Sequence, residues 1–242
     1  MRTSSFKTIR DSVLRRMGLD AAQPVLGSQA AAIADYIEAG LSDVWGLYDW
    51  PDTTLTEART PAGSVITYRV AGESTIGQIL RITDFLPSST RLVQTFSFAD
   101  NDDSVTITDS RYTANTEVQV KFRRPEPRLT STAFAAGTAY SPGDVVYFDT
   151  TGDCYLCIAA TTGNLPTSAT HWERQSIPAI FAPYLRAAAF ANTLEEDGQY
   201  DKAAFQLQKA EAEIVKTHDD IFLRNNNTPL TWSLQRDSVS PY

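Results

Sequence analysis

Two cysteines and two histidines are the side chains of this 242-residue chain best suited to bind a metal ion or to act as nucleophile and base. Cys154 and Cys157 form a single C-x-x-C pair. A zinc site needs two further ligands at a suitable spacing, and His171 and His218 are far apart. The residues around the cysteines are typical of strands, in which residues three apart point to opposite faces. We therefore expect two buried, free thiols, with a hairpin distortion that brings them together as the alternative.

Motifs of catalytic and nucleotide-binding sites are absent from the sequence. There is no glycine-rich phosphate loop, no nucleophile elbow and no helical pair of zinc-binding histidines. His218 precedes two aspartates near the expected end of a helix, where a histidine is commonly a favourable end charge. We expect His171 in a surface loop, and the acidic runs Asp102–Asp103 and Glu195–Asp197 in solvated turns. The prediction is a protein that is not an enzyme and that binds neither a cofactor nor a metal ion.

The composition is that of a folded, acidic protein. Hydrophobic residues make up 42% and charged residues 21%, and 21 Lys and Arg against 29 Asp and Glu give a net charge of −8. A basic surface marks proteins that read nucleic-acid sequence, so this balance argues against such a role. No run approaches the roughly 18 apolar residues of a membrane span, and the first residues lack the apolar core of a secretory signal. We expect synthesis in the cytoplasm and no association with membranes.

Apolar residues at helical spacing occur near both ends of the chain. They predict α-helices over residues 4–17, 28–48, 177–197 and 199–223. Ser4 or Ser5 suits the cap of the first helix and Gly18 its end, while Pro178 suits the first turn of the third. We predict an α+β protein in which these four helices form a bundle.

Between the helices, the sequence period changes to that of strands. Short runs rich in Val, Ile, Thr and aromatic residues fill residues 53–122 and predict an antiparallel meander or small barrel. The segment 123–128 contains two prolines and several charges, as linkers do. Residues 129–175 have the composition of a small all-β insert. The resulting organisation is a domain of residues 1–128 and 176–224, interrupted by the insert and followed by a tail over residues 225–242.

The insert contains a characteristic order of residues: Ala139 to Tyr147, then Cys154 to Ala159, then Gly163, Pro166 and the closing Trp172. This order resembles the small chitin-binding type of carbohydrate-binding module. The resemblance implies a compact β unit that binds sugar.

The aromatic residues of the insert depart from that pattern. Where the module has an exposed aromatic pair that stacks on the sugar, this chain has Ala159 and Ala160, so the apolar stacking surface is missing. Tyr140 is the remaining candidate for a carbohydrate contact. We expect the other aromatic residues to form the insert's own small core: Tyr147, Tyr155 and Trp172.

The tail over residues 225–242 contains few apolar residues and shows no helix or strand period. Trp232 is the exception, because a large aromatic side chain in a polar segment is costly unless it docks on something. Two interpretations remain open: the tail folds back on its own domain, or it docks on a partner. In the second case the docking residues are Asn227, Pro229, Leu230 and Trp232.

The overall plan of the chain provides a second resemblance. The plan is two N-terminal helices, a β region, two C-terminal helices and a polar tail, and two local patterns accompany it, Ile33–Ile37 and Trp45–Pro51. Together they resemble the head-to-tail adaptor proteins of tailed bacteriophages, the family that includes podovirus tail tubular proteins.

That resemblance implies a structural protein of the virion neck and tail, made in the host cytoplasm. Members of the family form a ring, usually of twelve copies, that lies beneath the portal protein, extends the DNA channel and receives the tail tube or nozzle. The helices build the ring, and the C-terminal extension reaches the portal. DNA passes without sequence-specific binding, which an acidic surface favours. The alternative is a carbohydrate-binding accessory or host-adhesion protein that acts through the insert.

Overall fold

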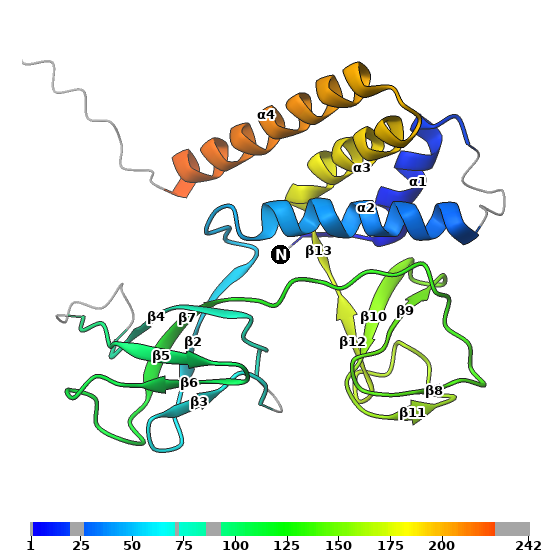
Figure 1. Ribbon diagram of the computed structural model, residues 1–242. Helices are drawn as coiled ribbons and strands as arrows, with labels where there is room; N and C mark the ends of the chain where they lie inside the picture. The colour runs from blue at the N-terminus through cyan, green and yellow to red at the C-terminus, as the bar shows by residue number, and fades with distance from the viewer. Residues whose placement is uncertain (1, 20–26, 71–72, 86–92, 226–242) are drawn as a thin grey trace, which may run out of the picture.

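The fold is mixed α+β, with the helices on one side of the molecule and two β units side by side on the other (Figure 1). The computed structural model describes residues 2–19, 27–70, 73–85 and 93–225. Within these ranges there are four α-helices and several small antiparallel sheets. The helices are α1 (Phe6–Arg16), α2 (Gly27–Trp45), α3 (Ala182–Glu196) and α4 (Tyr200–Asn225). The predicted α+β class is therefore confirmed.

The first helix begins and ends where the sequence indicates. The hydroxyl of Ser5 accepts a hydrogen bond from the backbone N–H of Thr8 at 3.2 Å, which caps α1. Gly18 follows the helix with a φ of 78°, and its N–H donates to the Arg15 carbonyl at 3.1 Å. The apolar side of the helix is fully buried: Phe6, Ile9, Val13 and Leu14.

The second helix is shorter than predicted, ending at Trp45 instead of residue 48. The indole N–H of Trp50 donates to the Val44 carbonyl at 2.8 Å and so satisfies one of the carbonyls left free at a helix end. Trp50 itself is buried. The Val44 carbonyl also accepts from the Leu47 N–H at 3.3 Å, a tighter turn than that of an α-helix, so the helical hydrogen-bond pattern ends here.

The third helix begins later than predicted, at residue 182 instead of 177. Residues Ile177–Pro178 form β13, which pairs antiparallel with β1 (Thr3–Ser4), and a short 3-10 helix over Ala179–Phe181 follows. Pro183, not Pro178, occupies the first turn of α3. The hydrogen bonds that hold β13 extended come from the far end of the chain, so local sequence could not indicate them.

All four helices contribute to one apolar core, and α3 lies at its centre, since nine of its fifteen residues are buried. Gly40 of α2 faces α3, and a β-carbon built there would be in ordinary van der Waals contact with Leu185, 3.4 Å from its Cδ2. Trp45 and Trp50 both pack edge-on against Phe181, with ring centroids 6.0 and 5.3 Å apart. These contacts join α2 and the turn after it to the beginning of α3.

The β region consists of two three-stranded antiparallel sheets, so the antiparallel pairing is as predicted and the predicted meander is wrong. The strands are β2 (Thr54–Arg59), β3 (Val65–Thr67), β4 (Gln78–Thr83), β5 (Phe98–Asn101), β6 (Ser104–Ile107) and β7 (Val118–Arg123). Their orders are β2-β7-β4 and β3-β6-β5. In a meander each strand lies beside the next, whereas here β7 lies between β2 and β4. Val118, Val120 and Phe122 of β7 are buried in an apolar core that residues of both sheets share.

The insert contains a third three-stranded sheet, in the order β12-β10-β9, and a short pair of β8 and β11. The strands are β8 (Ala139–Tyr140), β9 (Val145–Phe148), β10 (Asp153–Cys157), β11 (Thr161–Thr162) and β12 (Trp172–Gln175). One side of the sheet holds the expected small core, which includes Tyr155 and Trp172. Tyr147 belongs instead to the helical core, so its assignment to the insert's core was wrong. The reason is strand alternation, which turns Tyr147 toward Phe6, at a centroid distance of 5.8 Å.

The insert is attached to α1 as well as to the chain on either side of it. The backbone N–H of Lys7 donates to the Gly152 carbonyl at 2.8 Å, and the Lys7 ammonium lies 2.9 Å from Asp149. The guanidinium of Arg10 lies over the Tyr147 ring, 5.1 Å from its centroid. These contacts attach one side of the insert to α1. The other side of the insert faces away from the helices.

Candidate functional site

The outermost helix, α4, carries two apolar stripes. The inner stripe packs on the other helices and consists of Ala203, Ala210, Ile214 and Ile221. The outer stripe follows alternating steps of three and four residues and is apolar at four of its six positions: Phe205, Gln208, Ala212, Val215, Asp219 and Phe222. Because each residue advances by about 100° around a helix, the centres of the two stripes lie about 150° apart. They therefore lie on opposite sides of the helix.

The outer stripe is exposed to solvent in the isolated chain. Phe205 is 64%, Val215 45% and Phe222 56% accessible. Six of the eleven large apolar side chains that are exposed in the described ranges belong to α4. Figure 1 shows this helix at the edge of the helical layer, with one side against α3 and the other facing away from the protein. Grouped apolar exposure of this kind marks an interaction surface.

In the sequence, heptad-like steps along this helix are followed by Ala203, Leu207, Ala210, Ile214 and Ile221. This set matches the inner stripe except for Leu207, whose side chain is 38% exposed, and the outer stripe was missed. The signal was present, because the outer residues repeat the three- and four-residue steps of a helix that packs on both sides. A second set with the same steps is easily overlooked, because the first set is already sufficient to predict the helix.

The C-terminal part of α4 is joined to the end of α2 by stacked rings. The imidazole of His218 stacks on Tyr48 with centroids 3.8 Å apart and planes 20° apart, and it meets Trp50 edge-on at 5.8 Å. On its other side lies Phe222, at 6.2 Å. The helix continues to Asn225, so the interpretation of His218 as an end charge was wrong, and its main contacts are aromatic.

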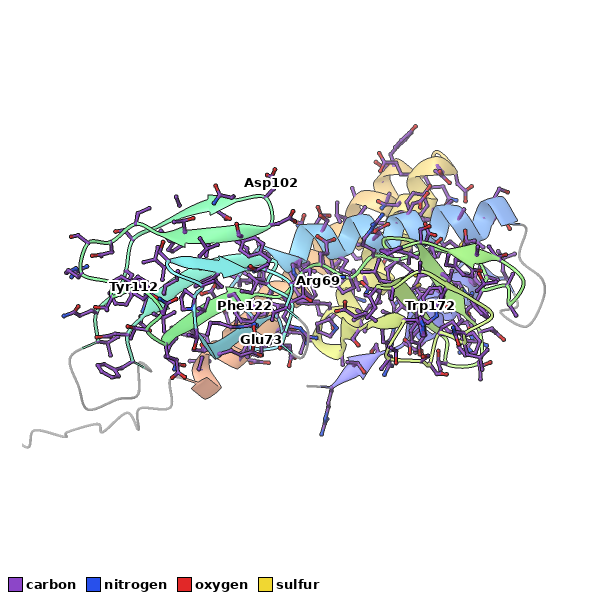
Figure 2. All side chains as sticks on the ribbon, turned by 90° about the horizontal axis from the view of Figure 1, so that it is seen from below. Arg69, Glu73, Asp102, Tyr112, Phe122 and Trp172 are labelled. Carbon is purple, nitrogen blue, oxygen red and sulfur yellow. The ribbon has the colours of Figure 1, made fainter. Side chains whose placement is uncertain are left out.

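A cleft of about 800 Å³ lies between the β region and the insert. The β region contributes Arg69, Val70 and Glu73, the insert contributes Leu156, Glu173 and Arg174, and the segment 124–128 lies between them. Figure 2 shows Arg69 between the two β units, with Phe122 on one side and Trp172 on the other. Arg69 and Glu173 approach to 3.7 Å across the gap, with both side chains largely exposed. An ion pair between exposed side chains contributes little free energy in water. This pair therefore attaches the two walls of the cleft to each other only weakly.

The segment 124–128 between the walls is firmly attached, although its sequence resembles that of a flexible linker. At one end the Trp45 indole donates to the Arg124 carbonyl at 3.0 Å, and the Gly77 N–H donates to Arg123 at 2.8 Å. At the other end the Arg128 N–H donates to the Gln175 side chain at 3.0 Å. The cleft therefore has a fixed floor before any ligand arrives.

Buried charges support both walls of the cleft. Arg59, which is buried, forms ion pairs with Glu57 at 2.9 Å and with Glu73 of the wall. On the insert side, Arg174 pairs with the buried Asp153 at 2.7 Å. Burial raises the pKa of Asp153, and the charge of Arg174 opposes that shift. The cleft is lined by residues from three distant segments, which is why sequence spacing alone did not reveal it.

Tyr140, the predicted carbohydrate contact, is half-buried at the edge of the insert's core. Its ring stacks on Phe134 at 5.7 Å and meets Trp172 edge-on at 5.1 Å. Its hydroxyl accepts a hydrogen bond from the Ala135 N–H at 2.9 Å. The ring thus has a structural role in the insert, and contact with a sugar stays a prediction.

The two cysteines are free, buried and on opposite sides of β10, as predicted. Cys154 lies in the helical core and Cys157 in the small core of the insert. Burial raises the pKa of the Cys154 thiol to about 12 and also raises that of Cys157. Neither thiol is suited to nucleophilic chemistry.

The remaining predicted site residues fall into two groups. His171 lies in a turn, where its Nδ1 is 3.3 Å from the Ser168 hydroxyl. The predicted docking residues lie outside the described residues: Asn227, Pro229, Leu230 and Trp232. Over the described ranges, no cluster of three or more His, Cys, Asp and Glu side chains could hold a metal ion. No helix in the same ranges is long and apolar enough to cross a bilayer.

No protein-family model matches this chain, and no curated protein sequence matches it significantly.

Proposed function

We propose that this protein is a ring-forming head-to-tail adaptor of a tailed bacteriophage, which joins the portal protein to the tail and extends the DNA channel. The observation that carries the proposal is the outer stripe of α4. A helix that packs on its own domain through one side and exposes an apolar stripe on the other is suited to repeated contacts between copies.

In this proposal the four helices form the bundle that builds the ring. The inner stripe of α4 stabilises each copy, and the outer stripe contacts a neighbour through a different surface, as closure of a ring requires. The net charge of −8 disfavours adhesion of DNA to the channel wall. The tail, with Leu230 and Trp232, reaches the portal, and the insert lies on the outside of the neck.

Mass measurement by light scattering, together with negative-stain electron microscopy, tests this function. We expect the wild-type chain to form rings as its concentration rises or when portal rings are added. The double variant Phe205→Glu, Val215→Glu should stay monomeric, because it places charge in the outer stripe. Leu165→Glu is the matched control, since Leu165 is also 53% exposed but lies in the insert. A wild-type chain that stays monomeric in the presence of portal rings would contradict the proposal.

A further inference from the structure

The outer stripe of α4 contains a groove of about 520 Å³ whose lining residues all belong to this one helix. Four of the six stripe residues line it: Gln208, Ala212, Val215 and Asp219. Beyond them lie two exposed phenylalanines, Phe205 toward the start of the helix and Phe222 toward its end. A pocket for a small ligand encloses most of the ligand's surface, which a single helix cannot do. A groove with an apolar residue at each end is suited instead to a second helix.

The outer stripe matches itself when a second copy of the helix runs in the opposite direction. Its steps of three and four residues read the same from either end, so each stripe position of one helix can lie level with a stripe position of the other. Aromatic rings then meet at both ends of the contact and apolar side chains meet at its centre. Between them, an amide group can donate a hydrogen bond to a carboxylate. The facing pairs are Phe205 with Phe222, Gln208 with Asp219, and Ala212 with Val215.

A parallel arrangement of the two helices fits the stripe less well. Each stripe residue would then face its own equivalent, so the Asp219 carboxylates of the two copies would meet inside the contact. Two like charges in an interface are strongly unfavourable. In the antiparallel arrangement, Asp219 lies level with Gln208 of the second copy, about 16 Å along the axis from the other Asp219. The stripe itself therefore favours the antiparallel orientation.

The charged residues beside the stripe support the antiparallel contact on one flank and weaken it on the other. On the first flank, Glu211 lies near the level of His218 of the second copy, whose ring can donate a hydrogen bond to a carboxylate. On the second flank, Lys209 lies near the level of Lys216 of the second copy. Repulsion between exposed charges costs little free energy. The lysines therefore limit the strength of the contact, and the stripe determines its orientation.

We infer that α4 binds α4 of a second copy in antiparallel orientation, with Phe205 of each helix against Phe222 of the other. Both copies use the same surface, so the contact closes on two copies and does not continue into a chain. One consequence rests on the proposed adaptor function: the dimer covers the outer stripe until ring contacts replace it, which keeps free copies from associating into open chains. The pairing itself does not depend on that function.

Disulfide trapping in the full chain tests the orientation. Gln208→Cys and Asp219→Cys both change exposed positions of α4, and the two native cysteines are buried. A mixture of the two variants should form a mixed disulfide on oxidation, because the two positions face each other, whereas either variant alone should form no disulfide between copies. A chain with both substitutions should form a covalent dimer and nothing larger. A mixture of Leu165→Cys and Asp219→Cys is the control that should not link, since Leu165 is exposed but lies in the insert.

Reversal of one flanking charge provides a second measurement, read by sedimentation equilibrium. In the antiparallel dimer, Lys216→Glu places a carboxylate near Lys209 of the other copy, twice in each dimer, and should lower the dissociation constant by about three- to tenfold. In a parallel dimer the same carboxylate would lie beside Glu211 and raise that constant. Arg81→Glu is the matched control, because it makes the same change of charge at an exposed position of β4 and should leave the constant unchanged.

Four results would overturn the inference. They are a disulfide formed by either single variant alone, a ladder of species larger than a dimer from the double variant, no mixed disulfide at any concentration, and a dissociation constant that Lys216→Glu does not lower. The ladder would assign the outer stripe to a contact between two different surfaces. Rings that form on portal without a mixed disulfide in the free chain would leave the adaptor function intact. Trapped dimers of a protein whose wild-type chain forms no rings on portal would leave the dimer inference intact.

Discussion

Gly77 illustrates how one residue positions the two β units. A β-carbon at this site would lie 2.6 Å from the backbone nitrogen of Pro125 and 2.7 Å from its α-carbon, and backbone atoms cannot move aside cheaply. The same residue donates its N–H to Arg123. We predict that Gly77→Ala lowers the free energy of unfolding by about 1 to 3 kcal/mol, measured by urea denaturation, because the segment 124–128 must shift.

Gly137 provides the matched control for this substitution. No atom lies within 4 Å of a β-carbon built there, and its backbone is not in the left-handed region. Gly137→Ala should change the free energy of unfolding by less than about 0.5 kcal/mol. Equal stabilities of the two variants would show that the close contact at Pro125 is relieved without cost.

The cysteines and Tyr147 show which residue properties local sequence could predict. Cys154 and Cys157 were expected on opposite faces of a strand, because strand alternation depends only on their spacing. Tyr147 follows the same alternation, but its partner Phe6 is distant in the sequence. The orientation of a side chain is therefore local information, whereas the core that it joins depends on tertiary packing.

At the scale of elements, the two sides of α4 predict different effects for the same substitution. Ala210 is fully buried on the inner side, whereas Ala212 is exposed on the outer stripe. Ala210→Leu should lower the free energy of unfolding by about 1 to 3 kcal/mol, because it overpacks the helical core. Ala212→Leu should leave it within about 0.5 kcal/mol and increase self-association in sedimentation experiments. Similar effects of the two variants on stability would contradict the assignment of the two stripes.

Elements with a strong local period were predicted well, and their arrangement was not. The helices follow from apolar spacing, and the cap of α1 follows from Ser5 and Gly18. The start of α3 was misplaced because Ile177 and Pro178 pair with the other end of the chain. The sheet order β2-β7-β4 joins segments that are far apart in the sequence. The cleft requires all of these pairings at once, and so it was not predicted.

At the scale of the whole molecule, the insert depends on the helices for part of its core. Tyr147 and Cys154 on one side of its sheet are buried against α1, so an isolated segment 129–175 would expose them to water. A unit of about 45 residues has little other apolar surface to bury. We predict that isolated residues 129–175 do not fold and show a poorly dispersed proton NMR spectrum.

The reactivity of the two thiols provides a second test of whether the insert depends on the helices for its folding. In the full chain Cys154 and Cys157 are buried, and their raised pKa values keep them protonated at neutral pH. They should react with Ellman's reagent only as fast as the protein opens, whereas both thiols of the isolated segment should react at once. A dispersed spectrum with Cys157 protected and Cys154 reactive would instead show that the insert folds alone, with its small core intact. In that case the helices would carry an independently folding module, and the contacts with α1 would not be needed for the fold of the insert.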